Sequence, residues 1–215
     1  MTQPPPSSRP AHHHDTPGKD EIAELPPFDR LGMGQITLVA TEVQARAAAV
    51  QLAKAAVWGF DTESKPTFRA GEASDGPHIV QLSTPQHAWV FQLHDPACRA
   101  VVAGLLAQAG VVKAGFGLGD DKKRILHKLG VAPAGVLELN TIFRDRGYRK
   151  EMGVKGAVAV LFNRRYIKSK KAATSNWANA QLTEAQLIYA ANDAYAAVRV
   201  YDALGLPGQA PVIPT

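Results

Sequence analysis

The sequence predicts an α/β domain with a mixed central β-sheet flanked by helices. Short apolar segments with strand character fill most of the first half of the chain, and helical patterns dominate the second half. One βαβ-like crossover joins two of these strands, which requires a partly parallel sheet. With 215 residues, the chain suits a single domain of about 100–200 residues with a sizeable core.

The individual elements follow from residue type and periodicity. Five short apolar segments are predicted as strands: 36–41, 57–64, 78–84, 88–93 and 111–115. The third and fourth of these are expected to pair as a hairpin. Residues 42–55 and 96–110 are rich in good helix formers and predict helices. Further helices are expected up to Leu204, after which proline and glycine end regular structure.

Composition limits the class of protein. Residues 1–28 are rich in proline, serine and histidine without apolar periodicity, so we expect a disordered tail there, and a second tail at 207–215. No apolar run approaches the about 18 residues of a membrane span. Cys98 is the single cysteine, which excludes an intramolecular disulfide and fits a reducing cytosol. No secretory signal is visible, and we therefore expect a cytoplasmic protein.

Positive charge is concentrated in one segment. The formal net charge is +5, but residues 144–171 alone contain ten basic and two acidic side chains. Such a cluster is expected of a nucleic-acid binder, because each Lys or Arg that meets a phosphate releases condensed counterions. A solvated helix and loop would have the same composition, and charge alone favours neither interpretation.

The helix predicted over 186–201 carries an acidic residue on an apolar face. At about 100° per residue, Tyr189 and Asp193 share a stripe with small and apolar side chains. A carboxylate there needs a partner to offset its desolvation, and the spacing of four brings the Tyr189 phenol to the same partner. The opposite interpretation is a paired core carboxylate beside a packing aromatic. The expected solvent edge of this helix is Asn192, Arg199 and Asp202.

Further carboxylates stand at the ends of two predicted strands. Asp61 and Glu63 end the strand "VWGFDTES", and strand alternation sends both side chains to one face. In "KAGFGLGDDKKRIL", Asp120 and Asp121 fall in the first turn of a helix after a glycine-rich turn. The helix dipole alone favours an acidic residue at that position.

Taken in order, these groups resemble the motifs of a known family. Asp61-x-Glu63, then Gly117-Leu118-x-x-Asp121, then Tyr189-x-x-x-Asp193 are similar to the three motifs of the DEDD exonucleases. With its tyrosine, the third motif resembles the branch that contains ribonuclease D and the Werner syndrome exonuclease domain. The stretch "SNWANAQLTEAQLIYAANDAYAA" is especially similar, and the resemblance spans about residues 35–205. Gly117 stands where many relatives have Asn, and the choice of Asp121 over Asp120 rests on spacing.

The resemblance implies a ribonuclease H-like exonuclease domain at 29–206 that removes nucleotides from 3' ends. It also implies two Mg²⁺ or Mn²⁺ ions, which suit oxygen ligands and no thiols, about 3.5–4 Å apart. Asp61, Glu63 and Asp193 would hold the first ion. Asp61 would also bridge to the second ion, which Asp121 would support. Tyr189 would orient the attacking water, and its role as a base requires a pKa well below a phenol's value near 10.

The expected partner is nucleic acid with a free 3' end, gripped by stacking and basic groups. Candidate contacts lie after the first motif, on the next strand and before the third motif: Lys65, Phe68, Arg69, His78, Gln81, Lys168, Lys170, Lys171 and Trp177. Trp177 is also suited to packing below the third motif. We favour single-stranded or 3'-recessed DNA, with RNA possible. The alternatives are an enzyme that trims short oligoribonucleotides and an inactive nucleic-acid-binding adaptor. The oligomeric state stays open. "GFGLGD" lacks the glycine spacing of a dinucleotide-binding oxidoreductase.

Overall fold

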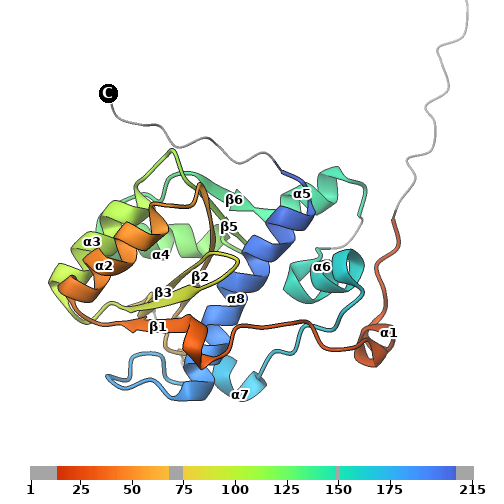
Figure 1. The fold of residues 1–215 in the computed structure, drawn as a ribbon, viewed down its shortest axis with the longest axis horizontal. Coiled ribbons are helices and arrows are strands. Elements are labelled where there is room, and N and C mark those ends of the chain that lie inside the picture. The colour runs from red at the N-terminus through yellow and green to blue at the C-terminus, as the bar shows by residue number, and fades with distance from the viewer. Residues whose placement is uncertain (1–13, 68–74, 149–150, 207–215) are drawn as a thin grey trace, which may run out of the picture.

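The computed structural model describes residues 14–67, 75–148 and 151–206. A six-stranded sheet in the order β1-β4-β3-β2-β5-β6 forms its centre (Figure 1). The strands are β1 (Ile36–Val39), β2 (Val57–Glu63), β3 (Ile79–Ser83), β4 (Ala88–Gln92), β5 (Val112–Gly115) and β6 (Val136–Glu138). The β2–β3 and β3–β4 pairs are antiparallel, and the other three pairs are parallel. The mixed α/β sheet expected from the sequence is confirmed.

The sequence patterns did not predict the short strand β6. The segment Val136–Glu138 pairs in parallel with β5 at the sheet edge. Its three residues are all half-buried, so neither an apolar run nor an alternating pattern of useful length marks it. Edge strands of this length take their structure from the neighbouring strand, which local sequence cannot reveal.

Helices cover both faces of the sheet. The helices are α1 (Lys19–Glu24), α2 (Glu42–Leu52), α3 (Pro96–Leu106), α4 (Gly119–Leu129), α5 (Leu139–Asp145), α6 (Gly153–Phe162), α7 (Lys170–Ala173) and α8 (Glu184–Ala203), with a 3₁₀ turn at Met33–Gln35. One hydrophobic cluster joins the sheet to α2 and α3, and a second joins its other face to α6 and α8 (Figure 1). In the described ranges, no helix has the length and apolar character to cross a membrane.

Helix α8 lies directly against the sheet. Thr183 caps its N-terminus by accepting a hydrogen bond from Gln186 N, as expected of a capping threonine. Opposite α8, Gly59 of β2 has no room for a side chain, because an added Cβ would lie 1.8 Å from the Ala194 carbonyl oxygen. This close approach requires small side chains on α8, which explains why the helix is rich in alanine. It also brings Tyr189 and Asp193 of α8 close to the end of β2.

The described part of the N-terminal segment has a defined path, in contrast to the disordered tail expected for residues 1–28. It contains α1, and its backbone pairs with the loop before α7 through a bridge between Pro27 and Arg165. Asn192 shows the effect on α8. This expected solvent-edge residue is buried, and its amide binds the backbone N–H and C=O of Leu31. The expectation for Asn192 was wrong because a segment distant in sequence covers it.

Candidate active site

Three carboxylates meet where β2 ends beneath α8. Asp61 and Glu63 point to the same face of β2, as strand alternation requires, and Asp193 approaches from the helix. One carboxylate oxygen from each lies within 4.8 Å of the others. Asp61 and Glu63 are half-buried, and Asp193 is almost fully buried.

The cluster is electrostatically costly without a cation. Burial, followed by repulsion from Asp193, raises the pKa of Asp61 well above its ordinary value. Burial, followed by repulsion from Asp61, raises the pKa of Glu63 to about 9. Oxygen ligands gathered in this way fit a hard divalent cation, and a cation would reverse the repulsion that opposes ionisation.

Asp121 stands at the margin of this group. Its carboxylate accepts a hydrogen bond of 2.5 Å from Thr62 Oγ1, and Thr62 lies between the two acidic residues of β2. Burial raises the pKa of Asp121. The neighbouring Asp120 is 79% exposed and lies 3.9 Å from Lys123. The two acidic residues at the start of α4 are therefore in different environments, and the charge of Asp121 contributes to the raised pKa values of Asp61 and Glu63.

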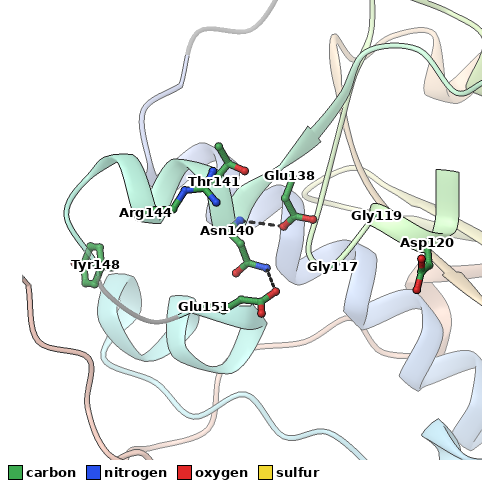
Figure 2. A pocket seen from close by; sticks show the side chains of 9 residues that line it. All are labelled: Gly117, Gly119, Asp120, Glu138, Asn140, Thr141, Arg144, Tyr148 and Glu151. Atoms are coloured by element: carbon green, nitrogen blue, oxygen red, sulfur yellow. Dashed lines mark hydrogen bonds between the residues drawn. The ribbon is translucent and has the colours of Figure 1, made fainter.

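Asp120 faces a separate cleft of about 550 Å³, drawn in Figure 2. The cleft lies between the start of α4 with its glycine turn and helix α5, and it extends to Tyr148 and Glu151. Within it, Glu138 accepts from the backbone N–H groups of Leu118 and Asn140, and the Asn140 amide donates to Glu151. None of the three clustered carboxylates lines this cleft.

Tyr189 lies one turn before Asp193 on α8, as predicted. Its ring packs on Trp177 at a centroid distance of 5.9 Å. Burial, followed by the charge of Asp193, raises the pKa of Tyr189 well above that of a free phenol. Without a bound metal the phenol is therefore neutral at neutral pH, and its O–H can donate a hydrogen bond.

Two side chains from the loop after α6 engage Asp193. Tyr166 Oη donates to Asp193 Oδ1 at 2.6 Å. Lys168 Nζ forms an ion pair with Oδ2 at 2.7 Å, and the same ammonium lies 5.0 Å from the centroid of the Tyr189 ring. Both oxygens of the buried carboxylate therefore have a partner, and the Lys168 ammonium partly offsets the negative charge of the cluster.

The expected nucleic-acid contacts are dispersed. Lys170 and Lys171 are exposed on α7, whereas Lys168 points into the carboxylate cluster. Trp177 is fully buried, so neither face of its ring is open to a base. Phe68 and Arg69 lie outside the described residues.

The remaining three candidates flank the first motif. His78 is buried and occupied, with Nδ1 accepting from Lys65 N and Nε2 paired with Asp75. Lys65 is half-buried. Gln81, the register partner of Asp61, is fully buried, and its amide has no hydrogen-bond partner in the described part of the chain. Trp177 therefore packs below the third motif, as the alternative interpretation proposed. In this conformation the buried His78 and Gln81 side chains are not accessible to a nucleic acid.

Tyr166 is the site residue that sequence reasoning missed. It stands in the basic segment, where lysine and arginine drew attention to charge alone. The signal that would find it is alternation: in an extended loop Tyr166 and Lys168, two residues apart, point to the same side, as Asp61 and Glu63 do.

Comparisons with known proteins bear on this geometry. Residues 36–207 match the family described as 3'-5' exonuclease. The mouse bifunctional 3'-5' exonuclease/ATP-dependent helicase WRN is 29% identical over 160 residues, which cover 73% of this chain and 11% of that protein. An Arabidopsis thaliana 3'-5' exonuclease is 28% identical over 148 residues, covering 68% of this chain and 51% of the relative. The structure of Trypanosoma brucei RNase D in complex with RNA U12 has a TM-score of 0.70 at 20% identity, covering 90% of this chain and 67% of that one.

Because the match includes most of the chain, this protein belongs to the 3'-5' exonuclease family. Its fold is the ribonuclease H-like fold expected from the sequence. The chain spans about half of the length of the Arabidopsis relative and a small part of WRN.

Proposed function

We propose that this protein is a metal-dependent 3'-5' exonuclease that hydrolyses the terminal phosphodiester bond of a nucleic-acid strand. The observation that carries the proposal is the convergence of Asp61, Glu63 and Asp193 within 4.8 Å at the end of β2. In a protein that only binds nucleic acid, three crowded carboxylates would weaken binding, because they repel the phosphates of the nucleic acid. For this reason the inactive adaptor is the weaker alternative.

The proposed roles divide between metal binding and positioning. Asp61, Glu63 and Asp193 would hold one Mg²⁺ or Mn²⁺ ion, and Asp121 would support a second beside Asp61. Two such ions supply charge stabilisation for the attacking and leaving oxygens of an in-line displacement. The donor set contains carboxylates and no thiolate, which matches the preference of these ions.

Two further side chains would act on the substrate. The Tyr189 phenol, one turn from Asp193 on α8, would orient the attacking water by a hydrogen bond. The Lys168 ammonium, 2.7 Å from Asp193 Oδ2, lies close enough to the cluster to meet a phosphate oxygen of the bond being cleaved. A fixed cation there would stabilise the charge that develops on the phosphate.

For the substrate, we propose single-stranded or 3'-recessed DNA, on the similarity to the exonuclease/helicase WRN. RNA is the second candidate, because the similar T. brucei RNase D structure contains RNA. Short oligoribonucleotides belong to that second class. A cytoplasmic location stays a prediction that rests on cysteine usage.

The polarity of cleavage tests the proposal. Single-stranded DNA and RNA of several lengths, labelled at the 5' end or at the 3' end, are incubated with Mn²⁺, Mg²⁺ or EDTA and resolved on a gel. We expect a ladder that shortens from the 3' end, requires the metal and is strongest for DNA. Absence of cleavage by the folded protein on every substrate would refute the proposed activity.

The basic surface of α7 supports a second measurement. Lys170 and Lys171 are exposed, so replacing both with alanine should weaken DNA binding and reduce the slope of log affinity against log salt by about 1 per lost phosphate contact. Lys54→Ala, in the exposed turn that follows α2 on the opposite side of the sheet, is the control. An unchanged salt dependence of DNA binding in the α7 variant would show that this helix does not contact the DNA.

A further inference from the structure

Asp193 is held differently at its two oxygens. Oδ2 pairs with the Lys168 ammonium at 2.7 Å, and this group stands at the end of a long side chain with several rotatable bonds. Oδ1 accepts a 2.6 Å hydrogen bond from Tyr166, whose ring is buried. A phenol has few rotatable bonds, and the buried ring holds the donating O–H in place. Tyr166 therefore restricts the rotation of a carboxylate that has one oxygen within 4.8 Å of oxygens of Asp61 and Glu63.

Tyr166 is itself held by the N-terminal segment 26–31. Phe28 N donates to Arg165 O at 2.9 Å, and Arg165 N donates to Pro26 O at 2.8 Å. The centroid of the Phe28 ring lies 6.4 Å from the ring centroid of Tyr166 and 6.2 Å from that of Tyr195 on α8.

Two more contacts hold segment 26–31 and the helix α1 that precedes it. Leu31 exchanges two hydrogen bonds with the Asn192 side chain, next to Asp193. The Arg165 guanidinium also donates to the Ala23 carbonyl. The whole segment precedes residues 36–207, the part of the chain that matches the family.

We propose that Tyr166 is a positioning residue for the Asp193 carboxylate, and that segment 26–31 maintains the metal affinity of the site by holding Tyr166 in place. This inference rests on the proposed function. Its physical basis is that partners of metal ligands orient them, and their loss typically lowers metal affinity by about 10–100-fold. A segment that precedes the family match would thus help to position a metal ligand of this chain.

The first test is the Mn²⁺ affinity of Tyr166→Phe, measured by thermal melting across a Mn²⁺ titration and by the electron paramagnetic resonance signal of free Mn²⁺. We expect an apparent Kd about 10-fold or more above that of the wild type. Excess Mn²⁺ should restore kcat, and the KM for DNA should change little.

Tyr195→Phe is the matched control. It removes a buried phenol hydroxyl from the same aromatic cluster, but that hydroxyl pairs with Arg199 at 2.5 Å and does not contact Asp193. Its Mn²⁺ affinity should equal that of the wild type.

A double-mutant cycle tests the role of the segment. Phe28→Ala should weaken Mn²⁺ binding in the wild-type background and have no further effect on that affinity in the Tyr166→Phe background. Phe28→Leu, which keeps most of the apolar volume, serves if the alanine variant does not fold.

Three results would overturn the inference. Mn²⁺ affinity of Tyr166→Phe within about twofold of wild type would reduce Tyr166 to a packing residue. An equal loss in Tyr195→Phe would show a general effect of the cluster, and additive effects of Phe28→Ala and Tyr166→Phe would exclude action through Tyr166. In each case the wild type can still degrade DNA from its 3' end, so failure of the inference is distinguishable from failure of the proposed function.

Discussion

At the scale of single residues, the carboxylates of the site repel one another when no metal is bound. Asp61, Glu63 and Asp193 have oxygens within 4.8 Å of one another, and burial together with this repulsion raises the pKa values of the first two. The folded protein without metal therefore retains protons that the unfolded chain releases. Stability becomes dependent on pH through these groups.

The sign of this dependence is testable with Glu63→Gln. The pKa of Glu63 is raised from 4.5 to about 9 on folding, so between these values the folded state binds more protons and stability falls as pH rises. Glutamine does not ionise, so the variant does not lose this part of its stability as pH rises. In EDTA, the melting temperature of Glu63→Gln should exceed that of the wild type by a margin that grows from pH 5 to pH 8. A margin that is constant over this range would contradict the raised pKa.

Lys168 is predicted to stabilise the metal-free fold. Lys168→Met leaves Asp193 without its cation, and we expect a loss of about 1–2 kcal/mol. This is less than the about 3–5 kcal/mol for a fully buried pair, because the Lys168 side chain is 31% exposed. The corresponding fall in melting temperature is about 2–4 °C per kcal/mol.

Lys170→Met provides the control for this measurement, because Lys170 is exposed on α7. Both variants are melted in EDTA at pH 7. Equal melting temperatures for the two variants would mean that the Lys168 ammonium does not stabilise the cluster.

At the scale of elements, the contact between β2 and α8 determines the position of the site. Gly59 allows the helix backbone to approach the strand, because an added Cβ would meet the Ala194 carbonyl oxygen at 1.8 Å and Val198 N at 3.0 Å. Backbone atoms cannot yield as a flexible side chain does. The helix would have to move away from Asp61 and Glu63.

Gly59→Ala should therefore destabilise the protein by more than about 3 kcal/mol, which is an overpacking cost at the upper end of the usual range. Gly104→Ala is the contrasting change, since an added Cβ in α3 meets nothing within 4 Å. A helix-interior alanine should stabilise by about 0.5–1 kcal/mol. Urea unfolding of both variants decides the matter, and a harmless Gly59→Ala would contradict the close approach.

The elements differ in how far the sequence predicts them. Strand β2 and helix α8 have strong local signals, the apolar run ending in Asp61-x-Glu63 and the alanine-rich periodicity around Tyr189. Their meeting was predictable only through the family resemblance. The short edge strand β6, the burial of Asn192 and the bond from Tyr166 depend on contacts between segments far apart in sequence, and no local pattern encodes such contacts.

At the scale of the whole molecule, metal binding and folding are coupled. The carboxylates come from β2 and α8, and the side chains that hold Asp193 come from a loop attached to the N-terminal segment. An ion bound only by the folded state stabilises it by mass action. Millimolar Mn²⁺ should raise the melting temperature of the wild type, and should do so much less for Asp61→Asn. A melting curve unaffected by Mn²⁺ would count against the metal site.

The most direct test of the central claim is the dependence of 3'-5' cleavage on individual carboxylates. Cleavage of 5'-labelled DNA is timed with excess enzyme and Mn²⁺ for the wild type, Asp193→Asn, Asp121→Asn and Asp120→Asn. Loss of several kcal/mol of charge stabilisation corresponds to at least about 100-fold in rate. We predict that loss for Asp193 and Asp121, and near wild-type rates for the exposed Asp120. Wild-type cleavage by Asp193→Asn would contradict the account, because the chemistry would then lie elsewhere in the molecule.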